Sequence, residues 1–242
     1  MATSAIRAAS NAHAFTSAAR KLYDLNIEVL TAEEEARLCY CGAASKLSSW
    51  SGPLAVVDLG GGSCEVAVGE ATSYRASYSA DIGVLPLREA FCIKDKIGPI
   101  KAGAMSEVVR MSLRPASGML SANAPERLVL ASGTARSVHR LARSYFAGDL
   151  PPGQMTLLHA RKLRDYVVGR HPSEFLDHDV EVQRVDVIAT AVIVIETVMS
   201  QLACLTAEVS DRGLREGVAL REFAQPEQSV DSVPATLGCV SA

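Results

Sequence analysis

One stretch, LAVVDLGGGSCEVAVGE at residues 54–70, constrains the fold more than any other part of the sequence. The apolar run at its start has the length and β-branching of a buried strand. That run ends at Asp58, and a second run of alternating apolar residues begins at Glu65. Glycine tolerates a positive φ, so the pattern predicts an antiparallel hairpin with a tight turn. The turn consists of small residues: Gly60, Gly61, Gly62 and Ser63.

The predicted turn has the chemistry of a phosphate site. Backbone N–H groups that no side chain crowds form a concave surface suited to phosphate oxygens. Asp58 and Glu65 stand on either side of the turn, and paired carboxylates are a common way to hold Mg²⁺ beside phosphates. The sequence has no GxxxxGK[ST], and its glycines lead into a strand, which argues against a P-loop and a dinucleotide-binding fingerprint. A plain glycine-rich hairpin with an acid on each side is the alternative interpretation.

Composition narrows the class of protein. The 242 residues suffice for one large domain or two small lobes, and 48% hydrophobic with 5% aromatic residues is typical of α/β proteins. A net charge of −3 gives no reason to expect binding to nucleic acid or to a membrane surface. The apolar segment 187–195 is too short to span a bilayer. The six cysteines contain no CxxC, and without a secretory signal they predict reduced thiols in a cytoplasmic protein.

Before the hairpin, the sequence predicts a helix over 11–22 with one apolar face and a short strand over 27–30. Thr31 and Glu34 then form a capping box, with Thr at the N-cap and Glu at N3, which opens a helix through about residue 44. The first turn of that helix carries three successive acids, and favourable interaction with the helix dipole explains two of them. These acids are Glu33, Glu34 and Glu35.

After the hairpin, strands and helices alternate. Strands are predicted over 72–79, 127–131 and 205–209, and helices over 85–91, 102–113, 135–146, 155–169 and 182–202. The last of these strands runs into residues 211–217 and a final helix that ends at about 223. The small residues Ser132, Gly133 and Thr134 join the second of these strands to its helix. Such a helix N-terminus presents free N–H groups to an anion. The residues from 225 onward are predicted to be a mobile tail.

Five ordered segments resemble the exopolyphosphatase / guanosine pentaphosphate phosphatase family, and the first three are specific in combination. They are ATSAIRAASN (2–11), TAEEEARL (31–38), DLGGGSCE (58–65), ASGTAR (131–136) and DRGLREGVAL (211–220). The resemblance implies an α/β, actin-like fold of the ribonuclease H-like, actin–hexokinase–Hsp70 superfamily, with a phosphate cleft between two lobes. Residues 1–38 would be the remnant of an incomplete first lobe and 39–220 the second lobe. Residues 221–242 would hold the end of the terminal helix and the mobile tail.

The resemblance also implies roles for individual residues. The family releases terminal orthophosphate from polyphosphate, with Mg²⁺ neutralising oxygens and a glutamate activating water, and Glu35 resembles that glutamate by position. Arg7 matches a phosphate-binding arginine, a role that suits a guanidinium. Asp58 and Glu65 match the magnesium site, and Cys64 stands where a threonine is more usual. Further phosphate contacts fall on Gly60, Gly61, Gly62, Ser63, Gly133 and Thr134.

The leading hypothesis is therefore a phosphoanhydride hydrolase acting on inorganic polyphosphate or on guanosine penta- or tetraphosphate. Family members begin with a strand-turn-strand unit carrying a first phosphate loop. No such unit precedes Met1, which implies a truncated chain or a degenerate paralogue. The second hypothesis is accordingly a catalytically impaired phosphate-ligand binding or regulatory protein. Sugar or acetate kinase chemistry on the same superfamily fold is less favoured, because Glu35 stands in the hydrolase context. The substrate and the oligomeric state, a homodimer included, stay open.

Overall fold

A six-stranded sheet in the order β3-β2-β1-β4-β6-β5 forms the centre of the computed structural model, which describes residues 1–47, 49–147 and 149–224. β1, β4 and β6 are parallel to one another, while β2 is antiparallel to β1 and β3, and β5 is antiparallel to β6. The tail that we predict to be mobile lies outside the described residues. The strands are β1 (Pro53–Leu59), β2 (Cys64–Glu70), β3 (Ser73–Ala80), β4 (Arg127–Leu130), β5 (Gln154–Thr156) and β6 (Thr206–Val209).

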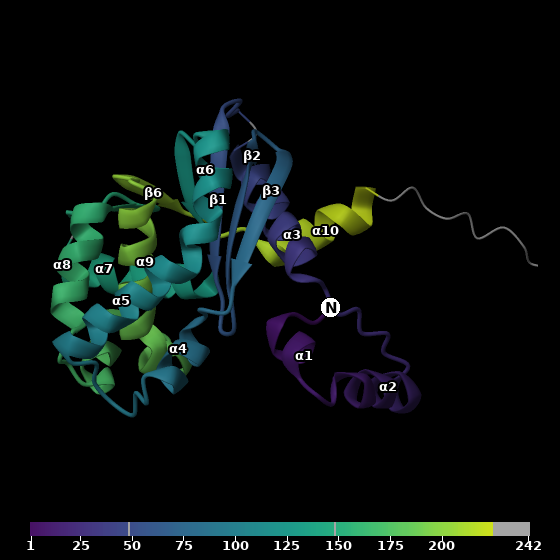
Figure 1. Ribbon diagram of the computed structural model, residues 1–242, viewed down its shortest axis with the longest axis horizontal. Helices are drawn as coiled ribbons and strands as arrows, with labels where there is room; N and C mark the ends of the chain where they lie inside the picture. The colour runs from purple at the N-terminus through teal and green to yellow at the C-terminus, as the bar shows by residue number, and fades with distance from the viewer. Residues whose placement is uncertain (48, 148, 225–242) are drawn as a thin grey trace, which may run out of the picture.

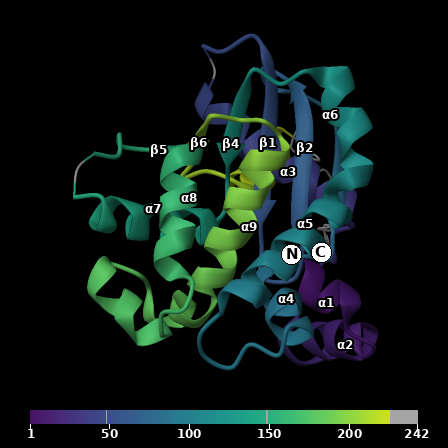
Figure 2. The same ribbon diagram turned by 60° about the vertical axis from the view of Figure 1, so that its left-hand side comes forward.

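Helices cover both faces of the sheet (Figures 1 and 2). On β1, Leu54 and Val56 point to one face and pack with α3, while Ala55, Val57 and Leu59 point to the other face and join the larger core. This alternation follows from the two-residue period of a strand. The helices are α1 (Ser4–Ala8), α2 (Ala12–Tyr23), α3 (Ala32–Ala44), α4 (Val84–Ala90), α5 (Pro99–Leu113), α6 (Ser117–Asn123), α7 (Gly133–Tyr145), α8 (Leu157–Val167), α9 (Ile188–Gln201) and α10 (Leu214–Ala224).

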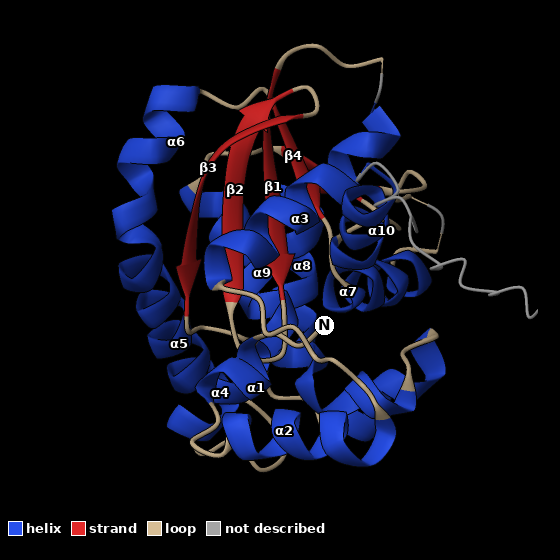
Figure 3. Cartoon of the chain, turned by 90° about the vertical axis from the view of Figure 1, so that its right-hand side faces the viewer, coloured by secondary structure: helices blue, strands red, loops and turns tan. Residues whose placement is uncertain are grey.

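Glycines bring α3 and α10 into backbone contact (Figure 3). A Cβ atom on Gly42 would lie 1.9 Å from the carbonyl oxygen of Gly213, and one on Gly217 would lie 1.8 Å from that of Leu38. No larger residue fits at either position without moving a helix. The contact therefore fixes the depth at which α3 lies on the sheet. α3 also runs without a break across the lobe boundary that we predict after residue 38.

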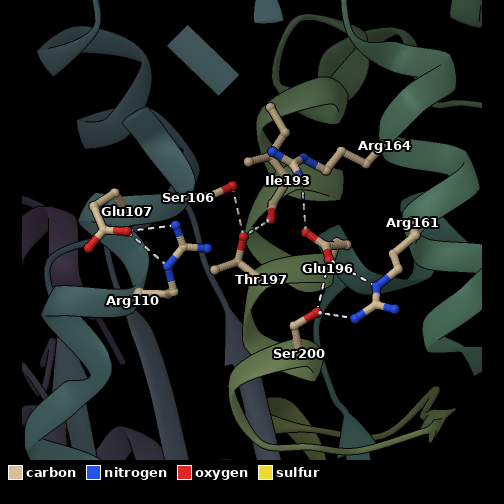
Figure 4. Close-up of polar contacts among 9 residues, drawn as sticks. All are labelled: Ser106, Glu107, Arg110, Arg161, Arg164, Ile193, Glu196, Thr197 and Ser200. Atoms are coloured by element: carbon tan, nitrogen blue, oxygen red, sulfur yellow. Dashed lines mark hydrogen bonds and ion pairs between the residues drawn. The ribbon is translucent and has the colours of Figure 1, made fainter. Parts of the chain in front are cut away.

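A polar network joins the helices on the opposite face (Figure 4). Glu196 of α9 has a side chain only 8% exposed, and it accepts a hydrogen bond of 2.9 Å from Ser200. Arg164 and Arg161 of α8 approach its carboxylate to 3.5 and 3.7 Å. Thr197 of the same helix donates to the carbonyl oxygen of Ile193 at 2.7 Å. A buried charge is tolerated only with such partners, so the network accounts for a glutamate in an otherwise apolar helix.

α1 and α2 lie at the end of the molecule toward which β1 points (Figures 1 and 3). The helix predicted over 11–22 is confirmed as α2, yet none of its residues is buried. The strand predicted over 27–30 is wrong. Only Val29 pairs, in a single parallel bridge with Ala2, because within the described residues no further strand lies beside it.

Most other predicted elements are confirmed within a few residues, including the capping box of Thr31 and Glu34. The helix predicted over 155–169 begins late, because residues 154–156 form β5 and pair with β6. The helix predicted over 182–202 is divided into a 3₁₀ turn (Val182–Val187) and α9. Within the part of the chain that the structure describes, each helix is too short or too polar to cross a membrane.

Candidate active site

The hairpin places two carboxylates side by side. Asp58 and Glu65 are directly opposite partners in the β1–β2 register, so their side chains leave the same face of the sheet. Glu65 is only 2% exposed and accepts a hydrogen bond of 2.8 Å from the hydroxyl of Ser79 on β3. Cys64 is fully buried, as a small filler would be. The hairpin predicted from the sequence is thus confirmed, and its two acids meet.

The turn has the free donors that a phosphate requires. The carbonyl oxygens of Gly60, Gly61 and Gly62 accept hydrogen bonds from backbone N–H groups at 83–85. Among the N–H groups of the turn, only that of Gly60 donates to a backbone carbonyl, that of Ser63 at 2.9 Å, within the described residues. The carbonyls are therefore turned toward α4, and the remaining N–H groups of the turn are available to a ligand.

Close approach, not an unusual backbone angle, accounts for these glycines. None of the glycines of the turn has a positive φ. A Cβ on Gly62 would instead lie 2.3 Å from the hydroxyl oxygen of Ser4 on α1. A Cβ on Gly83 would lie 2.3 Å from the carbonyl carbon of Gly62. The absence of side chains lets α1 and α4 close around the turn.

Glu35 and Arg7, the predicted base and phosphate ligand, are in direct contact. Glu35 lies in the first turn of α3 and is 7% exposed. Nη1 of Arg7 donates to Oε2 of Glu35 at 2.9 Å and to the carbonyl oxygen of Leu30 at 2.9 Å. The Arg7 side chain is 27% exposed. The pair fixes α1 against the start of α3.

A cleft of about 510 Å³ separates α1 from the glycine turn and α4, and Glu35 lines it. Its other charged lining residues, Asp81 and Glu89, are also acids. Small and apolar residues form the remaining walls: Ala5, Ala8, Leu85 and Pro86 beside Thr3, Ser4 and the turn from Gly60 to Ser63. Arg7 is not among the lining residues. Because the lining is acidic, a phosphate ligand would need a cation to enter.

Burial and mutual repulsion perturb the paired carboxyl groups. Burial, together with the charges of Asp58 and Glu35, raises the pKa of Glu65 to about 7, although hydrogen bonds from Ser63 and Ser79 oppose the rise. Burial likewise raises the pKa of Asp58 to about 6, with the Cys39 thiol and Arg136 opposing this effect. Burial and mutual repulsion both disfavour the ionised forms of the two acids. A bound divalent cation would offset both effects, so the pair suits such an ion. No cluster of three histidine, cysteine, aspartate or glutamate side chains able to hold a metal occurs in the described residues.

A second, smaller hollow is lined by Asp58, which does not line the first cleft. It has a volume of about 120 Å³ and lies where the N-termini of α7 and α10 converge. Ser132 caps α7 by accepting from the N–H of Ala135 at 2.8 Å. Glu216 accepts from the N–H of Gly213 at 2.8 Å. Two helix N-termini that share one hollow make it electropositive.

Two arginines that line this hollow, Arg136 and Arg215, are absent from the sequence-based site. Both belong to quoted segments, ASGTAR and DRGLREGVAL. The signal that could have found them is the repeated strand-turn-helix pattern after β4 and β6. These strands are parallel neighbours, so the turns after them meet at one edge of the sheet.

Gly133 and Thr134, although adjacent in the chain, have different surroundings. Gly133 lines the small hollow with Asp58, as the predicted phosphate contact requires. The hydroxyl of Thr134 accepts instead from Nη1 of Arg184 at 3.3 Å. A Cβ on Gly133 would lie 2.5 Å from Nη2 of Arg184, so a larger residue there would displace the end of that side chain. Arg184 is a third arginine that the sequence did not indicate.

Solved structures and sequence relatives define the class of protein. The fold is actin-like and matches an exopolyphosphatase from Cytophaga hutchinsonii with a TM-score of 0.82 and 23% identity, over 91% of this chain and 73% of that chain. It also matches the Aquifex aeolicus PPX-GPPA enzyme with a TM-score of 0.76 and 27% identity, over 90% of this chain and 73% of that chain. Both matches agree with the layers described above.

The chain belongs to the Ppx/GppA phosphatase family, whose family model matches residues 1–225. It is 32% identical over 211 residues to exopolyphosphatase 2 of Mycobacterium tuberculosis. This similarity covers 80% of the chain and 63% of the relative's length. The predicted family and fold class are therefore confirmed.

Proposed function

We propose that this protein is a phosphoanhydride hydrolase that releases terminal orthophosphate from inorganic polyphosphate. One observation carries the proposal: the buried carboxylate of Glu35 lines the same cleft as the glycine turn with its free N–H groups. A phosphate bound by those N–H groups would lie beside a proton acceptor that is largely shielded from water. The family membership and the exopolyphosphatase relative support the same reaction.

Glu35 would accept the proton of the water that attacks the terminal phosphorus. Within the described residues Arg7 donates through Nη1, to Glu35 and Leu30, so its other N–H donors could bind a phosphate oxygen without releasing the base. Because Arg7 does not line the cleft, its side chain would have to turn toward the cleft to make that contact. The N–H groups of the turn would stabilise the negative charge of the phosphoryl group during transfer.

Asp58 and Glu65 would hold Mg²⁺, which neutralises phosphate oxygens when it is bound. Two protein carboxylates suffice for this ion when substrate oxygens and water supply its other ligands. The fit rests on the opposed, buried carboxylates and their raised pKa values. Gly133, at the N-terminus of α7, would contact a phosphate in the small hollow lined by Asp58.

Guanosine pentaphosphate is the second candidate substrate. The observation that favours it is the apolar wall of the cleft, made by Leu85 and Pro86 opposite Ala5 and Ala8. A ribose or base could pack there, while the carboxylates of Asp81 or Glu89 could accept from amino groups. Inorganic polyphosphate has no apolar group that could pack against this wall.

Phosphate release should be measured from tripolyphosphate, long-chain polyphosphate and guanosine pentaphosphate, with and without Mg²⁺. Mg²⁺-dependent release that Glu35→Gln abolishes is the expected result. Binding of these compounds without any release would instead support an impaired phosphate-binding or regulatory protein. If the protein neither binds nor hydrolyses any of these compounds, the proposal is overturned.

We also propose a cytoplasmic location, supported by the five described cysteines, all of which are free thiols. The homodimer is a prediction that light scattering would test.

A further inference from the structure

An unbroken stripe of arginines follows α7 away from the candidate active site. Arg136, Arg140 and Arg143 are spaced four and three residues apart, which places them on one side of the helix. The stripe covers about 10 Å of the helix axis. In Figure 2, α7 extends beside α8 toward the edge of the molecule. The sequence motif ASGTAR accounts only for the first of the three arginines.

The stripe connects two hollows. Arg136 lines the small hollow that also contains Asp58 and Gly133. Arg140 and Arg143 line a separate hollow of about 440 Å³, together with Ser144 and Asp179. The positive charge thus begins at the candidate active site and ends in a second concavity.

Most of this charge is not neutralised. Within the described residues, neither Arg136 nor Arg143 forms an ion pair with a carboxylate. Arg140 pairs with Glu181, which also pairs with Arg184 at 2.8 Å. Asp179 is the acid that lines the outer hollow with Arg140 and Arg143, whereas Asp58 and Glu216 line the inner one with Arg136. The excess of positive charge is therefore greatest at the outer end of the stripe. Nε of Arg140 is also buried and has no hydrogen-bond partner in the described part of the chain.

An oriented hydroxyl lies at the far end of the stripe. The Oγ atom of Ser144 lies 2.9 Å from Nδ1 of His178, and Nε2 of His178 lies 2.9 Å from the hydroxyl of Tyr166. These contacts fix the position of the exposed Ser144 hydroxyl beside two guanidinium groups. Guanidinium and hydroxyl donors together are the usual ligands of phosphate oxygens.

We propose that this arginine stripe binds the phosphates of a polyphosphate chain that lie beyond those held at the glycine turn. The inference rests on the proposed function and narrows its substrate to long chains. From Gly133 to Ser144 the helix spans about 16 Å, a distance that only an extended polyanion covers while its end stays in the active site. Tripolyphosphate is too short to extend along α7 from Gly133 to Arg143, which are about 15 Å apart along the helix axis.

The test compares Arg143→Gln with wild type on tripolyphosphate and on long-chain polyphosphate. Loss of one charged donor should raise KM for the long chain about tenfold and leave its kcat unchanged. The ratio of the two KM values should therefore change. The matched control is Arg114→Gln, which removes an equally exposed arginine that lines none of the hollows described here. It corrects for the general effect of net charge on a polyanion.

A parallel binding measurement separates this inference from the proposed function. Fluorescence anisotropy of labelled long-chain polyphosphate would be recorded in the Glu35→Gln background, where the chain is not consumed. Weaker binding after Arg143→Gln, but not after Arg114→Gln, supports the stripe even if the wild type hydrolyses nothing. Equal effects of the two substitutions, an equal effect on both chain lengths, or no binding of the long chain would overturn it.

Discussion

The proposed catalytic role of Glu35 can be tested by Glu35→Gln, which keeps the volume of the side chain and removes its negative charge. The side chain is only 9% exposed and accepts from Arg7 at 2.9 Å. An amide oxygen can still accept that hydrogen bond, so the fold should survive. The loss of the charge-assisted component and of the helix-dipole interaction should cost about 1–2 kcal/mol of stability.

The effect on chemistry should be much larger than the effect on stability. An amide cannot take a proton from water, and the loss of a general base typically lowers the rate by about 10²–10⁴-fold. A hundredfold loss corresponds to about 2.7 kcal/mol in the activation barrier. Because Arg7 and the turn are untouched, KM for polyphosphate should stay near its wild-type value.

The assay is steady-state phosphate release at saturating Mg²⁺, with urea unfolding of each variant as the measure of stability. Glu33→Gln is the matched control, because Glu33 lies in the same first turn of α3 but is exposed. It should lose some helix-dipole stabilisation and no turnover. A folded Glu35→Gln protein with kcat within about twofold of wild type would refute the general-base role, since a hundredfold loss is the least expected.

Three further predictions concern the metal site, the paired acids and the helix contact. Asp58→Asn or Glu65→Gln should raise the Mg²⁺ concentration needed for half-maximal phosphate release, and an unchanged Mg²⁺ requirement in both would favour the plain glycine hairpin. Because the pKa of Glu65 rises from 4.5 to about 7 on folding, the folded chain binds more protons in that window, and stability falls as pH rises. Asp58, whose pKa rises to about 6, contributes a loss of the same sign. In Mg²⁺-free urea unfolding, stability at pH 8 should be about 3 kcal/mol below that at pH 5, and Glu65→Gln should remove the larger part of this difference. Gly217→Ala would place its Cβ 1.8 Å from the carbonyl oxygen of Leu38 and should destabilise the chain by about 2–3 kcal/mol, whereas Gly103→Ala, with open space around it, should be stabilising.

The sequence alone predicts those parts of the site that depend on residues close to one another in the chain. The hairpin register pairs Asp58 with Glu65 whenever four residues form the turn, and the capping box of Thr31 fixes where α3 begins. The position of Glu35 beside the turn depends on something else. It requires α3 to lie close to α10 through Gly42 and Gly217, a contact between segments that are distant in the sequence.

The sequence did not indicate the arginines of the small hollow for the same physical reason. Arg136 and Arg215 share a hollow only because β4 and β6 are parallel neighbours, which no local pattern reveals. The strand predicted over 27–30 failed for a related reason, since a strand needs a partner and its own β-branched residues cannot supply one. The glycine turn itself was predictable from the sequence. The close approach of α1 and α4, which is the reason that glycines are needed there, was not.

The cleft beside the glycine turn and the small hollow lined by Asp58 give the proposed substrate a direction. The cleft with Glu35 has only acids among its charged lining residues, so a long polyanion could not be threaded through it without many cations. The small hollow has Arg136 and Arg215 and the N-termini of two helices. The terminal phosphate would therefore lie at the glycine turn beside Glu35, with the rest of the chain leaving over α7. A hydrolase arranged in this way would release phosphate from the chain end, because the acidic lining of the cleft beyond the turn disfavours the entry of further phosphates.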